Sequence, residues 1–232
     1  RRGQRPNYKL PVIVFTMNVP FYLIVKFKTW LFLCLWCGLR VQGQSNVPRS
    51  GGFIVASNHV SYLDPVAVGV ACPRRLSFMA RRTLHHRPLM KCFLRNMGSI
   101  PIQHDWVDRG AIREAVRRLR QGQPVAIFPE GGRQFSPTLG EAKRGVGLLA
   151  VLARVPIVPV VVHGTFEALP RGSRRIRRAK IQVAFGPEIS YTVGRFSASQ
   201  PVRKAGLAAH HEALAEAVAQ SWHLLQNEFI HG

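Results

Sequence analysis

The chain has 232 residues, of which 47% are hydrophobic, and 33 Lys or Arg stand against 11 Asp or Glu. This composition excludes a disordered chain, and a single domain of this size buries roughly 70–75% of its extended surface without needing disulfides or metals. The formal net charge of +22 favours acidic partners: nucleic acid, anionic lipid or a phosphorylated small molecule.

The N-terminal part of the chain is both basic and apolar. Residues 1–63 contain no Asp or Glu, and the apolar runs 10–25 and 29–39 are separated by Lys26 and Lys28. This combination is typical of attachment to an anionic membrane face, whereas no nucleic-acid-binding module is recognisable, so we expect no nucleic-acid partner. Neither run reaches the roughly 20 residues of a transmembrane helix. We favour two helices half-sunk in one leaflet over a tilted span or a soluble core helix.

From residue 50 onward, short apolar runs alternate with helical periods. This alternation predicts a mixed, largely parallel sheet flanked by helices. The predicted strands are 53–57, 76–80, 99–102, 124–128, 157–162 and 180–185, and the predicted helices are 108–122, 139–154 and 201–229. Asp108 is the expected N-cap and Gly122 the expected stop of the first of these helices. We predict a membrane-attachment segment at 1–40 and an α/β domain at 41–232.

The four cysteines are Cys34, Cys37, Cys72 and Cys92. Cys34 and Cys37 form a C-x-x-C inside an apolar run, with no second pair at zinc spacing. We therefore expect reduced thiols, no metal site and a protein that faces the cytosol.

The stretch "SNHVSYLDP" (57–65) places His59 and Asp64 five positions apart, after an apolar strand. On one continuous helix these side chains would point about 140° apart, so they can meet only if a loop leads into a helix. Asp64 and Pro65 are a good helix start, with Asp at the N-cap and Pro at N1. His59 is then expected in the loop at the carboxyl end of the strand, where open α/β sheets bind ligands.

Three further stretches are candidates for function. "FPEGGRQ" (128–134) runs from a strand into a Gly-rich turn, where Arg133 has the forked geometry that binds phosphate or carboxylate. In "GSIPI" (98–102) the Pro restricts the strand to an edge or a bulge. "VPIVPVVVHG" (155–164) is either core or the lining of an apolar channel. The basic loop 169–180 is either a solvated turn or a surface that contacts phosphates or lipid headgroups.

In their order and spacing, these stretches resemble the glycerolipid acyltransferases of the lysophosphatidic acid acyltransferase (PlsC-like) family. "NHVSYLDP", "GSIPI", "FPEGGR" and "VPIVPV" are similar to the four sequence blocks of that family, over about residues 41–190. The resemblance implies a PlsC-like α/β fold and transfer of a fatty acyl group from acyl-CoA or acyl-carrier protein to a hydroxyl, most simply that of 1-acylglycerol-3-phosphate. No other cofactor is expected. An enzyme of this family would work at a membrane, facing the cytosol (the inner membrane in a bacterium).

The same resemblance implies roles for individual residues. His59 would be the general base, which suits an imidazole because it titrates near neutral pH, and Asp64 would orient it. The attacking hydroxyl belongs to the substrate, so Ser61 is not needed as a nucleophile. The predicted substrate-binding residues are Asn58, Ser61, Arg81, Glu130, Gly131, Gly132 and Arg133.

Two positions depart from the family's pattern. His104 stands where members usually carry an Arg, and Gly132 stands where they carry Thr or Val. His lacks the fork of Arg and is often neutral, so the acceptor could be a different lysophospholipid or an aminoacyl lipid. A thioester hydrolase and a non-catalytic basic membrane-binding protein are the alternatives from other classes.

Overall fold

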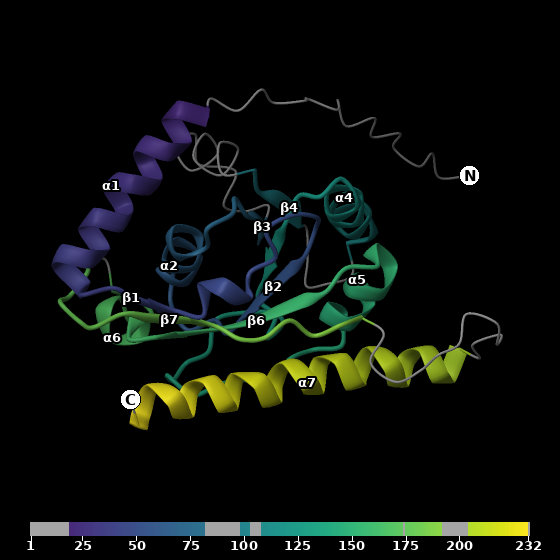
Figure 1. Ribbon diagram of the computed structural model, residues 1–232. Coiled ribbons are helices and arrows are strands. Elements are labelled where there is room, and N and C mark those ends of the chain that lie inside the picture. The colour runs from purple at the N-terminus through teal and green to yellow at the C-terminus, as the bar shows by residue number, and fades with distance from the viewer. Residues whose placement is uncertain (1–18, 82–97, 103–107, 174, 192–203, 232) are drawn as a thin grey trace, which may run out of the picture.

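A computed structural model describes residues 19–81, 98–102, 108–173, 175–191 and 204–231 (Figure 1). Its sheet has seven strands in the order β1-β7-β6-β2-β5-β3-β4. The strands are β1 (Arg40–Gln42), β2 (Ile54–Ser57), β3 (Ser77–Arg81), β4 (Ile100–Ile102), β5 (Val125–Ile127), β6 (Ile157–His163) and β7 (Gln182–Phe185). Every neighbouring pair is parallel except β6 and β7, which are antiparallel. The mixed, largely parallel sheet is thus confirmed.

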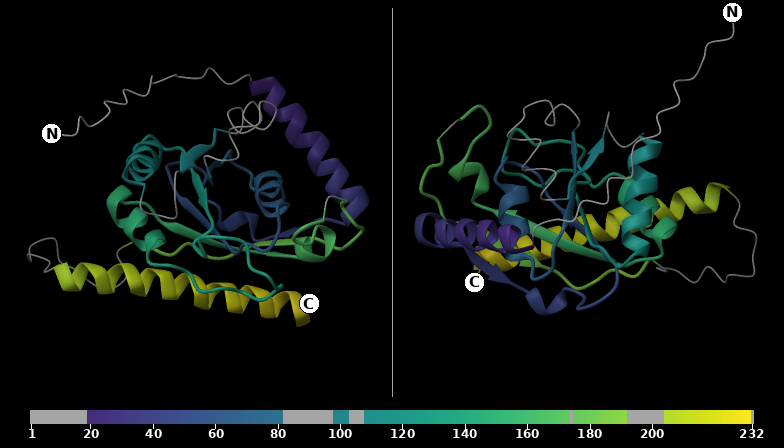
Figure 2. Two further views of the ribbon diagram at one scale, coloured as in Figure 1. Left: turned by 180° about the vertical axis from the view of Figure 1, so that it is seen from behind. Right: turned by 90° about the horizontal axis from the view of Figure 1, so that it is seen from above.

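Helices cover both faces of the sheet. One face carries α1 (Val19–Cys37) and α2 (Asp64–Ala71), and the other carries α4 (Arg109–Arg120), α5 (Gly145–Ala153) and α7 (Lys204–His231) (Figures 1 and 2). Because β2 is buried on both sides, Ile54 and Ala56 join the core under α7, while Phe53 and Val55 join the core under α2. The indole N–H of Trp222 on α7 donates to the Ala56 carbonyl at 3.0 Å. The central strand is therefore fixed from both faces.

Each of the six predicted strands is found, shifted by no more than two residues at an end. In α4 the Asp108 side chain accepts hydrogen bonds from the N–H groups of Gly110 and Ala111, and Gly122 follows the helix with φ of 78°. Both predicted boundary residues are thus confirmed. Pro101 lies in β4, at the edge of the sheet, which agrees with the edge position expected from its missing N–H.

The prediction of a helix over 139–154 was wrong at its start, because α5 begins only at Gly145. The preceding residues are bonded elsewhere. The Gly140 N–H donates to the Glu130 side chain at 3.2 Å, and the Lys143 N–H donates to the Pro129 carbonyl at 3.1 Å. These donors support the loop after β5, so the chain remains non-helical there. The strand β1 was not predicted, since three residues with a polar pattern give no clear signal.

The N-terminal helix α1 turns a large apolar surface outward. Its exposed apolar residues include Leu23, Phe27, Leu31 and Leu35, while Leu33 is buried against the domain. Among the described residues, no helix is both long and apolar enough to cross a membrane. The predicted division into two helices at Lys26 and Lys28 was wrong, because α1 continues unbroken through both lysines. Residues 10–18 of the predicted pair lie outside the described residues.

The packing of α5 on α7 gives a test of the fold. An added Cβ at Gly147 would lie 2.3 Å from the backbone oxygen of His211, so the two helices approach closely only because Gly147 has no side chain. Gly147→Ala is expected to lower the free energy of unfolding by about 1–3 kcal/mol, although Ala is the better helix former. Chemical denaturation measures this. Gly110→Ala, on the exposed first turn of α4, is the control: its added Cβ would approach only the end of the Asp108 side chain, at 3.1 Å, and stability is expected to change by less than about 1 kcal/mol. A Gly147→Ala protein as stable as the wild type would contradict the packing.

Candidate active site

The candidate site lies where β2 ends in the middle of the sheet. The neighbours of β2 are β5 and β6, both parallel to it, so the carboxyl ends of three strands meet there. The loop 58–63 leads from β2 into α2, and the loop 128–134 follows β5. The two loops that carry the predicted chemistry are therefore brought side by side by the sheet itself.

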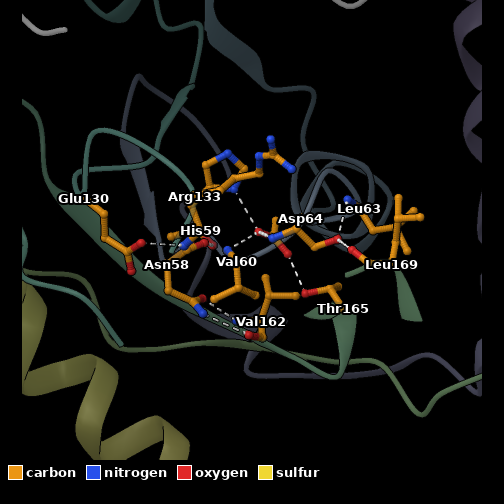
Figure 3. Close-up of polar contacts among 12 residues, drawn as sticks. Asn58, His59, Val60, Leu63, Asp64, Glu130, Arg133, Val162, Thr165 and Leu169 are labelled. Carbon is orange, nitrogen blue, oxygen red and sulfur yellow. Dashed lines mark hydrogen bonds and ion pairs between the residues drawn. The ribbon is translucent and has the colours of Figure 1, made fainter. Parts of the chain in front are cut away.

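Asp64 is fully buried, and its carboxylate accepts four hydrogen bonds (Figure 3). Its Oδ2 accepts from the backbone N–H groups of Val60 and Ser61, both at 2.7 Å, and from His59 Nδ1 at 2.8 Å. Its Oδ1 accepts from the Thr165 hydroxyl at 2.5 Å. A buried carboxylate is tolerated when its lone pairs are used in this way, so the loop has to close around Asp64.

The imidazole of His59 is held in one orientation. Because a carboxylate only accepts hydrogen bonds, the hydrogen bond with Asp64 assigns the proton to Nδ1 and leaves the lone pair on Nε2. The ring stacks on Phe128 with 4.1 Å between centroids, and it forms part of the wall of a cavity. His59 and Asp64 are thus paired as predicted, in the arrangement that a general base requires.

The prediction that Asp64 caps α2 was wrong by one position. Leu63 is the N-cap, Asp64 is the first helical residue, and the cap makes no side-chain hydrogen bond. The Asp64 carboxylate bonds instead to the N–H groups of Val60 and Ser61, which precede the helix. It organises the loop rather than the helix end.

The side chains of Asn58 and Ser61 form hydrogen bonds with other parts of the protein. The Asn58 amide accepts from the Val162 N–H at 2.8 Å and donates to the Val162 carbonyl at 3.0 Å, which joins the loop to β6. The Ser61 hydroxyl donates to the Leu169 carbonyl at 2.9 Å. Both residues are buried and lie outside the cavity wall described below. Their hydrogen bonds hold the loop 58–63 against β6 and against Leu169. Substrate binding by these two residues remains a prediction.

Glu130 connects the second loop to the first. One carboxylate oxygen accepts from the His59 N–H at 3.2 Å, and the other accepts from the Gly140 N–H. The His59 carbonyl in turn accepts from the Gln134 N–H at 2.8 Å. Burial raises the pKa of Glu130 to about 7, and the nearby Asp64 charge adds to this effect, while the hydrogen bonds from Gln134, Gly140 and His59 oppose it. The backbone of His59 is thus fixed on both sides by the 128–134 loop.

Gly131, Gly132 and Arg133 line the same cavity as His59. Gly131 has φ of 80°, a conformation that favours glycine, and this turns the chain back toward His59. The Arg133 guanidinium lies over the Tyr62 ring, 3.5 Å from its centroid. Arg81 ends β3, but its side chain lies outside what the structure describes, as does the whole of His104.

The cavity has a volume of about 490 Å³ and a mainly apolar wall. It extends from His59 and Arg133 into the space between α1 and α2, over β3 and the start of α4. Its wall includes Val25, Val66, Val70, Phe78, Met79 and Ile112. A concave apolar space of this size with a few polar groups at one end is typical of a ligand site.

The inner side of α1 forms one wall of this cavity. Lys26, which lines the cavity, donates from Nζ to the carbonyl of Cys72 at the end of α2, at 2.6 Å. Burial lowers the pKa of Lys26 and raises that of the Cys72 thiol to about 11. Cys34, Cys37 and Cys72 are free thiols, as predicted, and Cys92 lies outside the described residues. In the described part of the chain, no cluster of three or more metal-ligating side chains is present.

Sequence reasoning did not find several residues that shape the site. Thr165, which donates to Asp64, follows the stretch 155–164 that was interpreted as core or channel lining. Tyr62 and Phe128 lie inside the recognised stretches, where an aromatic next to His59 or Arg133 could have suggested stacking. Lys26 was assigned only to the membrane segment, since nothing local connects it to residue 72.

Together, the sheet, the His–Asp pair and the adjoining apolar cavity are the arrangement expected of an α/β enzyme with an apolar substrate. Comparison with known proteins specifies this class. The model of the acyltransferase family matches residues 38–163, more than half of the chain. The chain therefore belongs to the acyltransferase family.

Individual relatives agree with this assignment. The chain is 26% identical over 157 residues to the 1-acyl-sn-glycerol-3-phosphate acyltransferase of Bacillus subtilis, which covers 67% of the chain and 76% of that protein. It is 31% identical to the human 1-acyl-sn-glycerol-3-phosphate acyltransferase alpha over 66% of the chain, but this spans only 56% of the human protein. The crystal structure of the 1-acyl-sn-glycerophosphate acyltransferase PlsC from Thermotoga maritima superposes with a TM-score of 0.67 at 25% identity, and covers 86% of this chain and 78% of that one.

The buried Glu130 predicts a specific pH dependence of stability. Its pKa in the folded protein, about 7, lies above the ordinary value of 4.5, so the fold favours the protonated carboxyl. This contribution is complete below pH 4.5 and is lost as the pH rises through about 7. The free energy of unfolding of the wild type, minus that of Glu130→Gln, should therefore fall across this window by up to about 1.4 kcal/mol for each pH unit. Denaturant titrations at several pH values measure the difference, and a pH-independent difference would contradict the raised pKa.

Proposed function

We propose that this protein transfers a fatty acyl group from an acyl thioester to the free hydroxyl of 1-acylglycerol-3-phosphate, which gives phosphatidic acid. The observation that carries the proposal is the 2.8 Å contact between His59 Nδ1 and Asp64 Oδ2 at one end of an apolar cavity. The names of the relatives support this acceptor. The acyl donor is acyl-CoA or acyl-carrier protein, and the reaction needs no further cofactor.

The chemistry follows from the orientation of the imidazole. His59 Nε2 takes the proton of the acceptor hydroxyl as its oxygen attacks the thioester carbonyl. A C–O bond forms, the C–S bond breaks, and the imidazolium returns the proton to the leaving thiolate, so the enzyme ends unchanged. Asp64 keeps the proton on Nδ1 and stabilises the imidazolium.

The surrounding residues supply the binding functions in this proposal. The apolar cavity between α1 and α2 accommodates the acyl chain, since burial of apolar surface is favourable. Arg133, held over the Tyr62 ring, binds the acceptor's phosphate, and Gly131 and Gly132 let the acceptor approach the backbone. Glu130 contributes by positioning His59 and the 128–134 loop, because its buried carboxylate accepts hydrogen bonds from the N–H groups of His59 and Gly140.

We further propose that α1 attaches the enzyme to the cytosolic face of a membrane. Its outward residues, including Phe27 and Leu35, present apolar side chains to the surroundings, and its inner side lines the cavity. A lipid could thus pass from the leaflet to the site along one helix. Residues 1–40 are the proposed membrane segment and 41–232 the acyltransferase domain. The positive charge of the chain favours anionic lipid.

Replacement of the general base tests the reaction. His59→Ala is expected to lower acceptor-dependent thiol release from palmitoyl-CoA by about 10²–10⁴-fold, because the hydroxyl loses its proton acceptor. The assay uses purified protein in anionic liposomes, with and without lysophosphatidic acid, and identifies phosphatidic acid as the product. His223→Ala, an exposed histidine on α7, is the matched control and should keep full activity.

Each result of this assay assigns a function. Release that needs the lysophospholipid and is lost in His59→Ala supports the proposal. Release without any lipid acceptor would identify a thioester hydrolase, and release that needs only a different lyso- or aminoacyl lipid would replace the acceptor. Near-normal transfer by a folded His59→Ala protein would remove His59 from the mechanism.

The membrane role of α1 predicts a separate loss. The double variant Phe27→Ser/Leu35→Ser should bind anionic liposomes about 100-fold more weakly, because two large apolar side chains no longer enter the lipid. Liposome flotation or co-sedimentation measures the binding. Leu224→Ser, which changes an exposed leucine on α7 at the opposite face of the sheet, should bind like the wild type. Equal binding by all three proteins would contradict the attachment through α1.

A further inference from the structure

One residue of the basic loop reaches the cavity. The loop follows the short helix α6 (Thr165–Ala168), and Arg171 lies in the cavity wall together with His59 and Arg133. Arg171 is exposed, as are Arg177 and Arg178 of the same loop, but those two arginines lie outside the cavity wall. Arg171 therefore differs from them in lining the cavity.

The geometry of Arg171 repeats that of Arg133. Its guanidinium lies over the Phe135 ring, 4.0 Å from the centroid, as Arg133 lies over Tyr62. Its Nη1 points to the Arg133 carbonyl at 3.5 Å, a long contact that ties the basic loop to the 128–134 loop. Two planar cations, each supported by an aromatic ring, therefore line the cavity that contains His59, and the loops that carry them are in contact.

No carboxylate in the described part of the chain neutralises either cation, because neither Arg133 nor Arg171 forms an ion pair there. Two guanidinium groups that line one cavity repel one another, and stacking on a ring leaves N–H groups available for an acceptor. A dianion with several oxygens is the ligand that both relieves the repulsion and uses those donors, as in arginine–phosphate pairs.

We propose that Arg171 binds a phosphate group of the substrate jointly with Arg133, and that it thereby sets the preference of the site for phosphorylated substrates. This inference rests on the proposed acyl transfer at His59. The phosphate belongs to the acceptor or to the donor's carrier, since both bring phosphate to the site. Arg171 binds and does not exchange protons, so its loss weakens substrate binding while the general base remains intact.

Steady-state kinetics of three variants test this inference. Arg171→Ala should raise the KM for lysophosphatidic acid at least about 10-fold and leave kcat within about 2-fold, because one charge-assisted contact is lost. Arg171→Lys keeps the charge but loses the fork, and should fall between the wild type and Arg171→Ala. Arg178→Ala removes an equal charge from the same loop outside the cavity, and should keep the wild-type KM.

The substrate whose KM rises identifies the source of the phosphate. A rise for the lysophospholipid alone assigns the group to the acceptor, and a rise for the acyl thioester alone assigns it to the donor. Unchanged KM values for both substrates in Arg171→Ala overturn the proposal. Equal losses in Arg171→Ala and Arg178→Ala also overturn it, because they would show a general effect of charge on membrane binding.

A binding measurement separates this inference from the acyl transfer itself. Binding of glycerol 3-phosphate to the purified protein, measured by calorimetry or by ³¹P line broadening, needs no turnover. Weaker binding by Arg171→Ala than by Arg178→Ala would support the phosphate site even if the wild type transferred no acyl group. A different result would reject the Arg171 phosphate site but keep the proposed acyl transfer. In that case the wild type is active, and Arg171→Ala and Arg178→Ala have equal affinities for glycerol 3-phosphate and equal KM values.

Discussion

The burial of one carboxylate is the constraint on which the rest of the site depends. Asp64 lies in the interior, where an ionised group is costly unless donors surround it, and it gathers four of them. Two come from the backbone of Val60 and Ser61, so the loop is closed by the same atoms that orient His59. The fourth comes from Thr165, just beyond β6, so the loop is also fixed to a different strand. The hydrogen bonds that stabilise the Asp64 carboxylate therefore also fix the position of the His59 imidazole.

A second buried acid extends this arrangement to the neighbouring strand. Glu130 follows β5 and accepts from the backbone of His59, while the His59 carbonyl accepts from Gln134. Since β2 and β5 are adjacent and in register, with Ala56 opposite Ile127, these short contacts need no insertion in either strand. The sheet therefore fixes the position of His59 relative to the Gly-rich turn, and that turn places Arg133 in the cavity wall.

The sequence predicted what depends on local pattern and missed what depends on distant contacts. Periodicity gave the strands after residue 50 and the boundaries of α4, because burial on both faces and a capping Asp leave local signals. The pairing of His59 with Asp64 followed from the break between strand and helix. The Asp64–Thr165 contact spans 101 positions, and α5 starts late because residues 140–143 support Glu130. Neither feature leaves a signal in the residues next to it in the sequence. Sequence spacing likewise could not distinguish Arg171 from the other arginines of its loop, because only the folded structure shows which of these arginines lies in the cavity wall.

The burial of Cys72 affects which groups of the protein can react with a thioester. Its thiol lies behind the cavity wall, where burial raises its pKa to about 11, and Lys26 bonds to its carbonyl rather than to its sulfur. Thioesters exchange with thiolates, not with thiols, so at neutral pH this cysteine cannot take an acyl group from a bound donor. The same property makes it unreactive to alkylating reagents and slow to oxidise. The protein thus holds this buried sulfur atom in an unreactive form next to the helix that lines the cavity.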